Sequence, residues 1–131
     1  SWPTYLFVDA QFSLYISDGD NHRVMKWPKG ATAGIVVAGG NGKGEDLRQL
    51  CSPRGVWVDG SENVYVADAD NNRVVRWGKG AKEGLVIAGG NGAGGATNQL
   101  WCPEGLCFDR HGYLYLAEYR NNRVTRFSLC V

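Results

Sequence analysis

The sequence predicts an all-β fold made of repeated four-stranded antiparallel sheets, and three observations carry this prediction. A block of residues recurs at a constant offset of 50, without insertion or deletion. Each repeat contains short apolar runs rich in β-branched and aromatic residues, separated by Gly, Asn and Asp turn signals. No segment of about twelve residues or more has the periodicity of an amphipathic helix. Repeats of this length indicate stacked units that bury their apolar faces against one another.

The repeat divides the chain into three units, at 1–50, 51–100 and a partial third at 101–131. We expect four strands in each complete unit, and the sequence stops where the fourth strand of the third unit should begin. The expected strands are 5–9, 13–17, 23–27 and 34–38, then 55–59, 63–67, 73–77 and 84–88, and finally 105–109, 113–117 and 123–127.

Polarity changes along each unit. The first two runs are apolar at almost every position, which is typical of strands covered on both faces. The third run mixes charge with hydrophobic residues, as in 74–77, which reads VVRW. A gradient from apolar inner strands to a more polar outer strand indicates four-stranded blades stacked around an axis. We therefore expect about two and three-quarter blades of an incomplete β-propeller.

The second and third runs of the first unit are joined by a recognisable motif. Residues 15–24 read YISDGDNHRV, which resembles the NHL repeat with its strand, aspartate, short gap, Asn-His and strand. The resemblance covers essentially the whole chain, although Asn72 and Asn122 stand at the histidine position and Glu118 at the aspartate. NHL repeats usually build six-bladed propellers, so the resemblance implies about half of a ring.

Each unit also repeats an acid, an asparagine and an arginine at the same spacing. Asp and Asn side chains bond nearby backbone groups in turns, and an arginine two residues on can pair with the carboxylate. We interpret the set as the structural lock of a hairpin, since a feature of every unit builds the units rather than marks one site. A polar ligand-binding ring is the alternative. The members are Asp18, Asn21 and Arg23, Asp68, Asn71 and Arg73, and Glu118, Asn121 and Arg123.

Residues for catalysis or cofactor binding are few. The two histidines, His22 and His111, occupy non-equivalent places in the repeat, and no serine lies in a G-x-S-x-G elbow. Residues 68–72 begin like a calcium loop, but Arg73 and Lys79 stand where Gly and Glu are needed. The glycine-rich stretches 39–44 and 89–95 precede no helix that could present its N-terminus to a phosphate. We therefore predict no enzyme, no cofactor and no metal, and we interpret these stretches as loops between blades.

Four cysteines, Cys51, Cys102, Cys107 and Cys130, allow three disulfide pairings if all are oxidised. No pair has the C-x-x-C spacing of a zinc knuckle. Disulfides would indicate an oxidising, extracellular location. Buried free thiols in a cytoplasmic protein are the alternative.

Composition and the incomplete ring together limit the classes of function that we expect. Of 131 residues, 14 are basic and 13 acidic, and the net charge of +1 provides no field to attract nucleic acid or a membrane. An incomplete propeller leaves an unpaired strand edge at 123–127 and apolar end faces. We therefore expect a non-catalytic protein-interaction or structural scaffold, bound to further copies of itself in a ring or filament, or to the remaining blades of a longer chain. A fragment of a propeller enzyme resembling the amidating lyases or lactonase-like hydrolases, and an RNA-binding NHL surface, are the alternatives.

Overall fold

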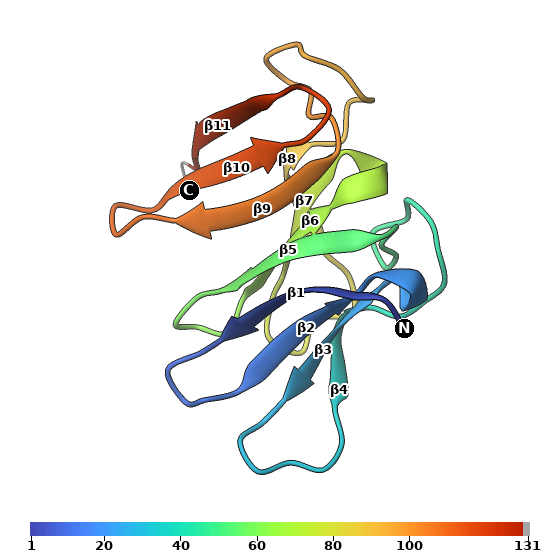
Figure 1. Ribbon diagram of the computed structural model, residues 1–131, viewed down its shortest axis with the longest axis vertical. Helices are drawn as coiled ribbons and strands as arrows, with labels where there is room; N and C mark the ends of the chain where they lie inside the picture. Colours follow the sequence, from blue (N-terminus) through green and yellow to red (C-terminus); the bar gives the residue numbers. More distant parts are fainter. Residues whose placement is uncertain (130–131) are drawn as a thin grey trace.

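The computed structural model describes residues 1–129, and these form three antiparallel sheets that follow one another along the chain (Figure 1). Within each sheet the strand order is the chain order, so each sheet is a meander. The all-β propeller fold and its incomplete third blade are confirmed. The blades comprise β1 (Pro3–Val8), β2 (Leu14–Asp18), β3 (Arg23–Trp27) and β4 (Ile35–Gly39), then β5 (Pro53–Val58), β6 (Val64–Asp68), β7 (Arg73–Trp77) and β8 (Leu85–Gly89), and β9 (Pro103–Phe108), β10 (Tyr113–Glu118) and β11 (Arg123–Ser128).

The first strands of the three blades lie side by side, with β5 in contact with both β1 and β9 (Figure 1). Two apolar clusters fill the spaces between blades. One joins Tyr15 and Val24 of the first blade to Val66 and other residues of the second. The other joins Val74 of the second blade to Leu114 and further residues of the third. The core of this protein is therefore made of blade junctions, as expected of stacked repeats.

The second and third strands of the first two blades are joined by a single turn of 3₁₀ helix, η1 (Gly19–Asn21) and η2 (Ala69–Asn71). These turns are the only helical segments within residues 1–129. The residue after each turn, His22 or Asn72, has a left-handed backbone, with φ of 51° and 52°. Asparagine adopts this conformation more readily than most residues, so the change from His to Asn costs the backbone little.

The glycine-rich loops between blades have the same internal bonding. The Asn41 side-chain amide donates to the carbonyl of Arg48 at 2.8 Å, and Gln49 donates to the carbonyl of Asn41 at 3.1 Å. Asn91 and Gln99 make the equivalent bonds in the next loop, at 2.7 and 3.1 Å. Each loop is thus closed on itself by two side-chain amides.

The expected polarity gradient is wrong for the second blade. In β7, Arg73, Val74, Val75 and Trp77 are all buried, and the most exposed strand of this blade is β8. Of the two charges in this strand, Arg76 is partly exposed, whereas Arg73 is buried because it pairs with Asp68 and donates to backbone carbonyls of the preceding loop. Within residues 1–129 no helix is long and apolar enough to cross a membrane.

Candidate functional site

The acid, asparagine and arginine of the second blade form one buried cluster. Asp68 ends β6 and pairs directly with Arg73 at the start of β7. One carboxylate oxygen of Asp68 accepts from Arg73 Nε at 2.7 Å and from the Asn71 amide at 2.9 Å, and the other from the backbone N–H of Cys51 at 2.7 Å. Burial raises the pKa of Asp68, and these hydrogen bonds oppose that rise. The carboxylate is occupied by the blade itself.

Arg73 has a second role that sequence reasoning missed. Its remaining N–H groups donate to the carbonyls of Glu45 at 2.8 Å, Gln49 at 3.0 Å and Asp46 at 3.2 Å, all in the loop from the preceding blade. The signal was the guanidinium itself, because its five donors exceed what one carboxylate can accept. Arg73 therefore locks its own hairpin and also fastens the neighbouring loop.

The first blade repeats the cluster with small differences. Asp18 accepts from Asn21 at 3.0 Å, from Arg23 Nε at 2.9 Å and from the Ser1 ammonium at 2.7 Å. Burial acts to raise the pKa of Asp18, but these hydrogen bonds outweigh it and lower the pKa. The nitrogen of Ser1 thus takes the place that the nitrogen of Cys51 takes beside Asp68.

In the third blade Glu118 replaces the aspartate and reaches the same partners. It accepts from Asn121 and from Arg123 Nε, each at 2.7 Å, and from the Thr125 hydroxyl at 3.0 Å. The backbone N–H of Trp101 also donates to it, at 3.2 Å. Burial would raise the pKa of Glu118, but the donors prevail and lower it. All three predicted sets are brought together, and each carboxylate accepts at least three hydrogen bonds from donors of the protein itself.

A second polar cluster joins all three blades along their innermost strands. The Tyr5 hydroxyl of β1 donates to Glu104 Oε2 of β9 at 3.3 Å, and Arg54 of β5 forms an ion pair with Glu104 at 3.4 Å. Burial, and then the charge of Glu104, raise the pKa of Tyr5. Arg54 and Glu104 occupy the same position of the repeat, where the first blade has Thr4, but nothing in the sequence indicated that opposite charges at this position would meet across a blade junction.

The end faces of the stack expose apolar side chains. At one position of the repeat, Val24 and Val74 are fully buried, whereas Val124 of the last blade is 71% exposed. At another position Val56 is 6% exposed, whereas Leu6 of the first blade is 68% exposed. These differences arise because, within the part of the chain that the structure describes, the first and last blades each have a neighbour on one side only.

The cysteines form no disulfide in the part of the chain that the structure describes. Cys51, Cys102 and Cys107 carry free thiols, so the pairings predicted among these three are not formed, and Cys130 lies outside the described residues. Burial raises the pKa of the Cys51 and Cys102 thiols, which disfavours the reactive thiolate. The extracellular location that disulfides would have indicated stays a prediction. Residues 1–129 contain no group of three or more His, Cys, Asp or Glu side chains that could hold a metal ion.

Comparison with protein families bears on the middle of the chain. The family model of the NHL repeat matches residues 50–77, from the end of the first inter-blade loop to the end of β7. Residues 50–77 are an NHL repeat. The resemblance of the sequence to NHL repeats is thus confirmed, and the NHL segment contains Asp68, Asn71 and Arg73. No curated protein matches the chain in sequence.

Solved structures share the fold. An auxiliary nutrient binding protein from Bacteroides thetaiotaomicron superposes with a TM-score of 0.74 at 17% identity, over 92% of this chain and 36% of that one. A structural genomics protein of unknown function from the same species gives 0.77 at 20% identity, over 95% and 34%. Virginiamycin B lyase from Staphylococcus aureus gives 0.65 at 11%, over 96% and 38%. This chain therefore spans about a third of the length of these structures and corresponds to part of a propeller.

Proposed function

We propose that this NHL propeller segment is a non-catalytic protein-interaction module that binds further blades of the same kind through its two end faces. The partner that we propose is another copy of the chain, and the remaining blades of a longer chain are the alternative. The observation that carries the proposal is the exposure of Val124 at a position where Val24 and Val74 are fully buried. Burying a valine side chain contributes about 1.5–3 kcal/mol, so an uncovered blade face favours association.

The two end faces are complementary rather than alike. The exposed face of the first blade carries Leu6 and Val8. The residues at the same positions of the second blade, Val56 and Val58, pack against the first blade. The exposed face of the last blade carries Val124, at the position of the valines that receive such a face. The first blade of one copy can therefore dock on the last blade of another as one blade docks on the next within the chain. Such head-to-tail contacts give a ring if the rotation closes and a filament if it does not.

The non-catalytic part of the proposal is supported by the contacts that the repeated polar groups already make within one chain. The carboxylates of Asp18, Asp68 and Glu118 each accept hydrogen bonds from the arginine and asparagine of their own blade and from a backbone or terminal nitrogen. A carboxylate so occupied has little capacity to act on a substrate. The repeated motif is therefore better suited to holding blades together than to chemistry.

Sedimentation velocity over a concentration series, with negative-stain imaging of the largest species, tests the proposal. We expect closed rings of two copies or filaments for the unaltered chain, and monomers for Val124→Glu and for Leu6→Glu, because each places a charge in a contact that must exclude water. Leu47→Glu is the matched control: Leu47 is 42% exposed but lies in the loop between the first two blades. A chain that stays monomeric at its highest soluble concentration, or assembly that survives Val124→Glu, would contradict self-association.

Two further measurements address the alternative functions. Elemental analysis that finds a stoichiometric metal in the purified chain would favour the fragment of a propeller enzyme. RNA affinity that falls steeply with added salt would favour an RNA-binding surface. We expect neither result.

A further inference from the structure

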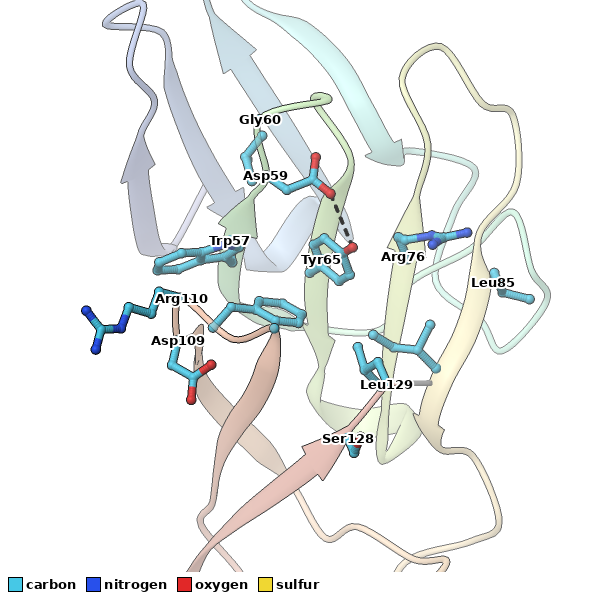
Figure 2. Close-up of a pocket in the computed structure, with 14 residues that line it drawn as sticks. Trp57, Asp59, Gly60, Tyr65, Arg76, Leu85, Asp109, Arg110, Ser128 and Leu129 are labelled. Carbon is cyan, nitrogen blue, oxygen red and sulfur yellow. Dashed lines mark hydrogen bonds between the residues drawn. The ribbon is translucent and has the colours of Figure 1, made fainter. Parts of the chain in front are cut away.

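A cavity of about 890 Å³ lies between the second and third blades, beside the β5–β6 and β9–β10 turns. Its walls are largely apolar. The ring centroids of Tyr65 and Phe108 are 4.6 Å apart, and those of Trp57 and Phe108 are 6.2 Å apart. In Figure 2 the ring of Tyr65 lies between Trp57 and Leu85, and all three residues line the cavity. This volume and lining are typical of small-molecule sites.

The junction between the first and second blades has a cavity at the equivalent place, of about 340 Å³. There a carboxylate crosses the junction: Glu62, from the β5–β6 turn, pairs with Lys26 of β3 at 2.7 Å and also with Lys79. Lys26 lies across the sheet from Tyr15, and its nitrogen is 5.6 Å from the centre of that ring. In the smaller cavity, the cation at this position of the repeat is therefore paired with a carboxylate.

At the second junction the same position of the repeat lacks the acid. Arg76 takes the place of Lys26 and lies across the sheet from Tyr65, but Gly112 stands where Glu62 stood. Within residues 1–129 Arg76 forms no ion pair. The other carboxylates of the wall are engaged, since Asp59 and Asp109 cap their own turns and accept from Tyr65 and Tyr115. Arg110 also lines the cavity, but its guanidinium points away from the rings (Figure 2).

We propose that this cavity binds a small organic carboxylate with an aromatic or branched aliphatic body. The carboxylate pairs with Arg76 in the place that Glu62 fills at the other junction, and the apolar body lies against Trp57, Tyr65 and Phe108. An arginine suits this role because its planar fork matches both oxygens of a carboxylate. The site lies between blades rather than on an end face, so it does not depend on self-association.

A pair of probes that differ only in charge tests the proposal on the unaltered chain. Titration with 3-phenylpropionate, followed by ¹H–¹⁵N correlation spectra, should shift the resonances of Trp57, Tyr65 and Gly112 in a saturable way. The neutral 3-phenylpropanamide should bind about tenfold more weakly, as expected for loss of a charge-assisted bond. Equal affinity of the two probes, no saturable binding, or shifts confined to other parts of the chain would each overturn the proposal.

Variants test whether Arg76 is the charged group that binds the carboxylate of the probe. Arg76→Gln should remove the preference for the acid over the amide, and Lys26→Gln, at the other junction, should leave it unchanged. Gly112→Glu supplies the missing acid from within and should abolish binding of 3-phenylpropionate, whereas Gly112→Gln, of nearly the same size, should weaken acid and amide alike. A preference for the acid that survives Arg76→Gln would overturn the assignment. The comparison of the two probes on the unaltered chain stands even if a variant does not fold.

Discussion

The imidazole Nδ1 of His22 accepts a hydrogen bond from the backbone N–H of Ser52, 3.0 Å away across the junction between the first two blades. Asn72 repeats the contact at the next junction, where its side-chain oxygen accepts from the backbone N–H of Cys102 at 2.9 Å. The histidine of the repeat motif therefore serves as a hydrogen-bond acceptor between blades. Asparagine provides an amide oxygen as acceptor in place of the ring nitrogen and has the same left-handed backbone.

Each end of the stack carries one of the two residues that form this contact at a junction, without the neighbouring blade that would carry the other. Asn122 has the left-handed backbone of His22 and Asn72, with φ of 49°, on a blade that has no successor in the described chain. Trp2 has φ of 53°, as Ser52 and Cys102 have 52°, on a blade that has no predecessor among residues 1–129. The end faces thus carry polar as well as apolar parts of a blade junction, which supports the proposal that they bind further blades.

Replacement of His22 separates the contribution of its hydrogen bond to stability from that of its left-handed backbone. We expect His22→Asn to leave the free energy of unfolding nearly unchanged, because both features are kept. His22→Gly keeps the backbone freedom but loses the acceptor, and His22→Ala loses both, at a total cost of about 1–3 kcal/mol. Urea unfolding followed by tryptophan fluorescence measures the series. A His22→Gly variant as stable as His22→Asn would show that the hydrogen bond contributes nothing.

Arg73 and Arg23 occupy the same position of the repeat but differ in burial. The side chains of Arg73 and Asp68 are 6% and 0% exposed, whereas those of Arg23 and Asp18 are 35% and 11% exposed. Arg73→Met leaves a buried carboxylate without its cation and should cost about 3–5 kcal/mol. Arg23→Met should cost about 1 kcal/mol or less, because water screens that pair and Asp18 keeps its other donors.

The double variant Asp68→Asn with Arg73→Met is the control for that comparison. It removes the charge that Arg73→Met strands, so it should be more stable than Arg73→Met alone. Chemical denaturation of the three variants at neutral pH measures the difference. Equal losses for Arg73→Met and Arg23→Met would contradict the role of burial.

The bridge from Lys26 through Glu62 to Lys79 predicts a dependence of stability on pH. The two ammonium groups lower the pKa of Glu62 from 4.5 to about 2. Because the folded-state pKa lies below the unfolded one, the bridge stabilises the protein above about pH 4.5 and this contribution is lost as the pH falls toward 2. The gap in melting temperature between the unaltered chain and Glu62→Gln should therefore be constant near neutrality and close on acidification.

Glu83→Gln is the control for this titration, since Glu83 is exposed and forms no ion pair within residues 1–129. It should shift the melting temperature little at any pH. A gap between the unaltered chain and Glu62→Gln that persists unchanged at pH 2 would show that the side chain acts through packing rather than charge.

The strands could be predicted from the sequence because their signal is local. Runs of β-branched and aromatic residues between Gly and Asp turns located all eleven, and the bounds moved by only one or two residues, as from 34–38 to Ile35–Gly39. The offset of 50 then fixed the blades. Pro3, which has no hydrogen to donate, extends the first strand beyond its expected start.

The contacts between blades could not be predicted, because they join residues far apart in the chain. Arg73 reaches carbonyls 24 to 28 positions earlier, and Lys26 meets Glu62 at a separation of 36. The change from Glu62 to Gly112 is visible in the repeat, but only the structure places that position opposite a cation and beside a cavity. Burial of Arg73 was missed for the same reason, since a charge in a strand normally indicates solvent.

Gly89 and Gly80 have the same backbone φ of 71° but different surroundings. A Cβ on Gly89 would lie 2.5 Å from the carbonyl oxygen of Asn72 and 2.8 Å from Leu100 Cδ1, whereas a Cβ on Gly80 would meet nothing within 4 Å. Gly80→Ala should therefore cost only the left-handed backbone, about 1–2 kcal/mol. Gly89→Ala should cost at least about 1 kcal/mol more, because a backbone oxygen must move.

That oxygen belongs to the residue whose side chain binds Cys102, so the strain of Gly89→Ala should reach the junction with the third blade. The carbonyl oxygen of Asn72 also accepts a hydrogen bond from the backbone N–H of Gly90 at 3.0 Å, so moving that oxygen would disturb this bond. We expect hydrogen exchange of the Cys102 amide to accelerate in Gly89→Ala and not in Gly80→Ala, beyond what the change in global stability explains. Equal acceleration in both variants would mean that the junction is insensitive to the position of Asn72, and that the blades are held together by their apolar faces alone.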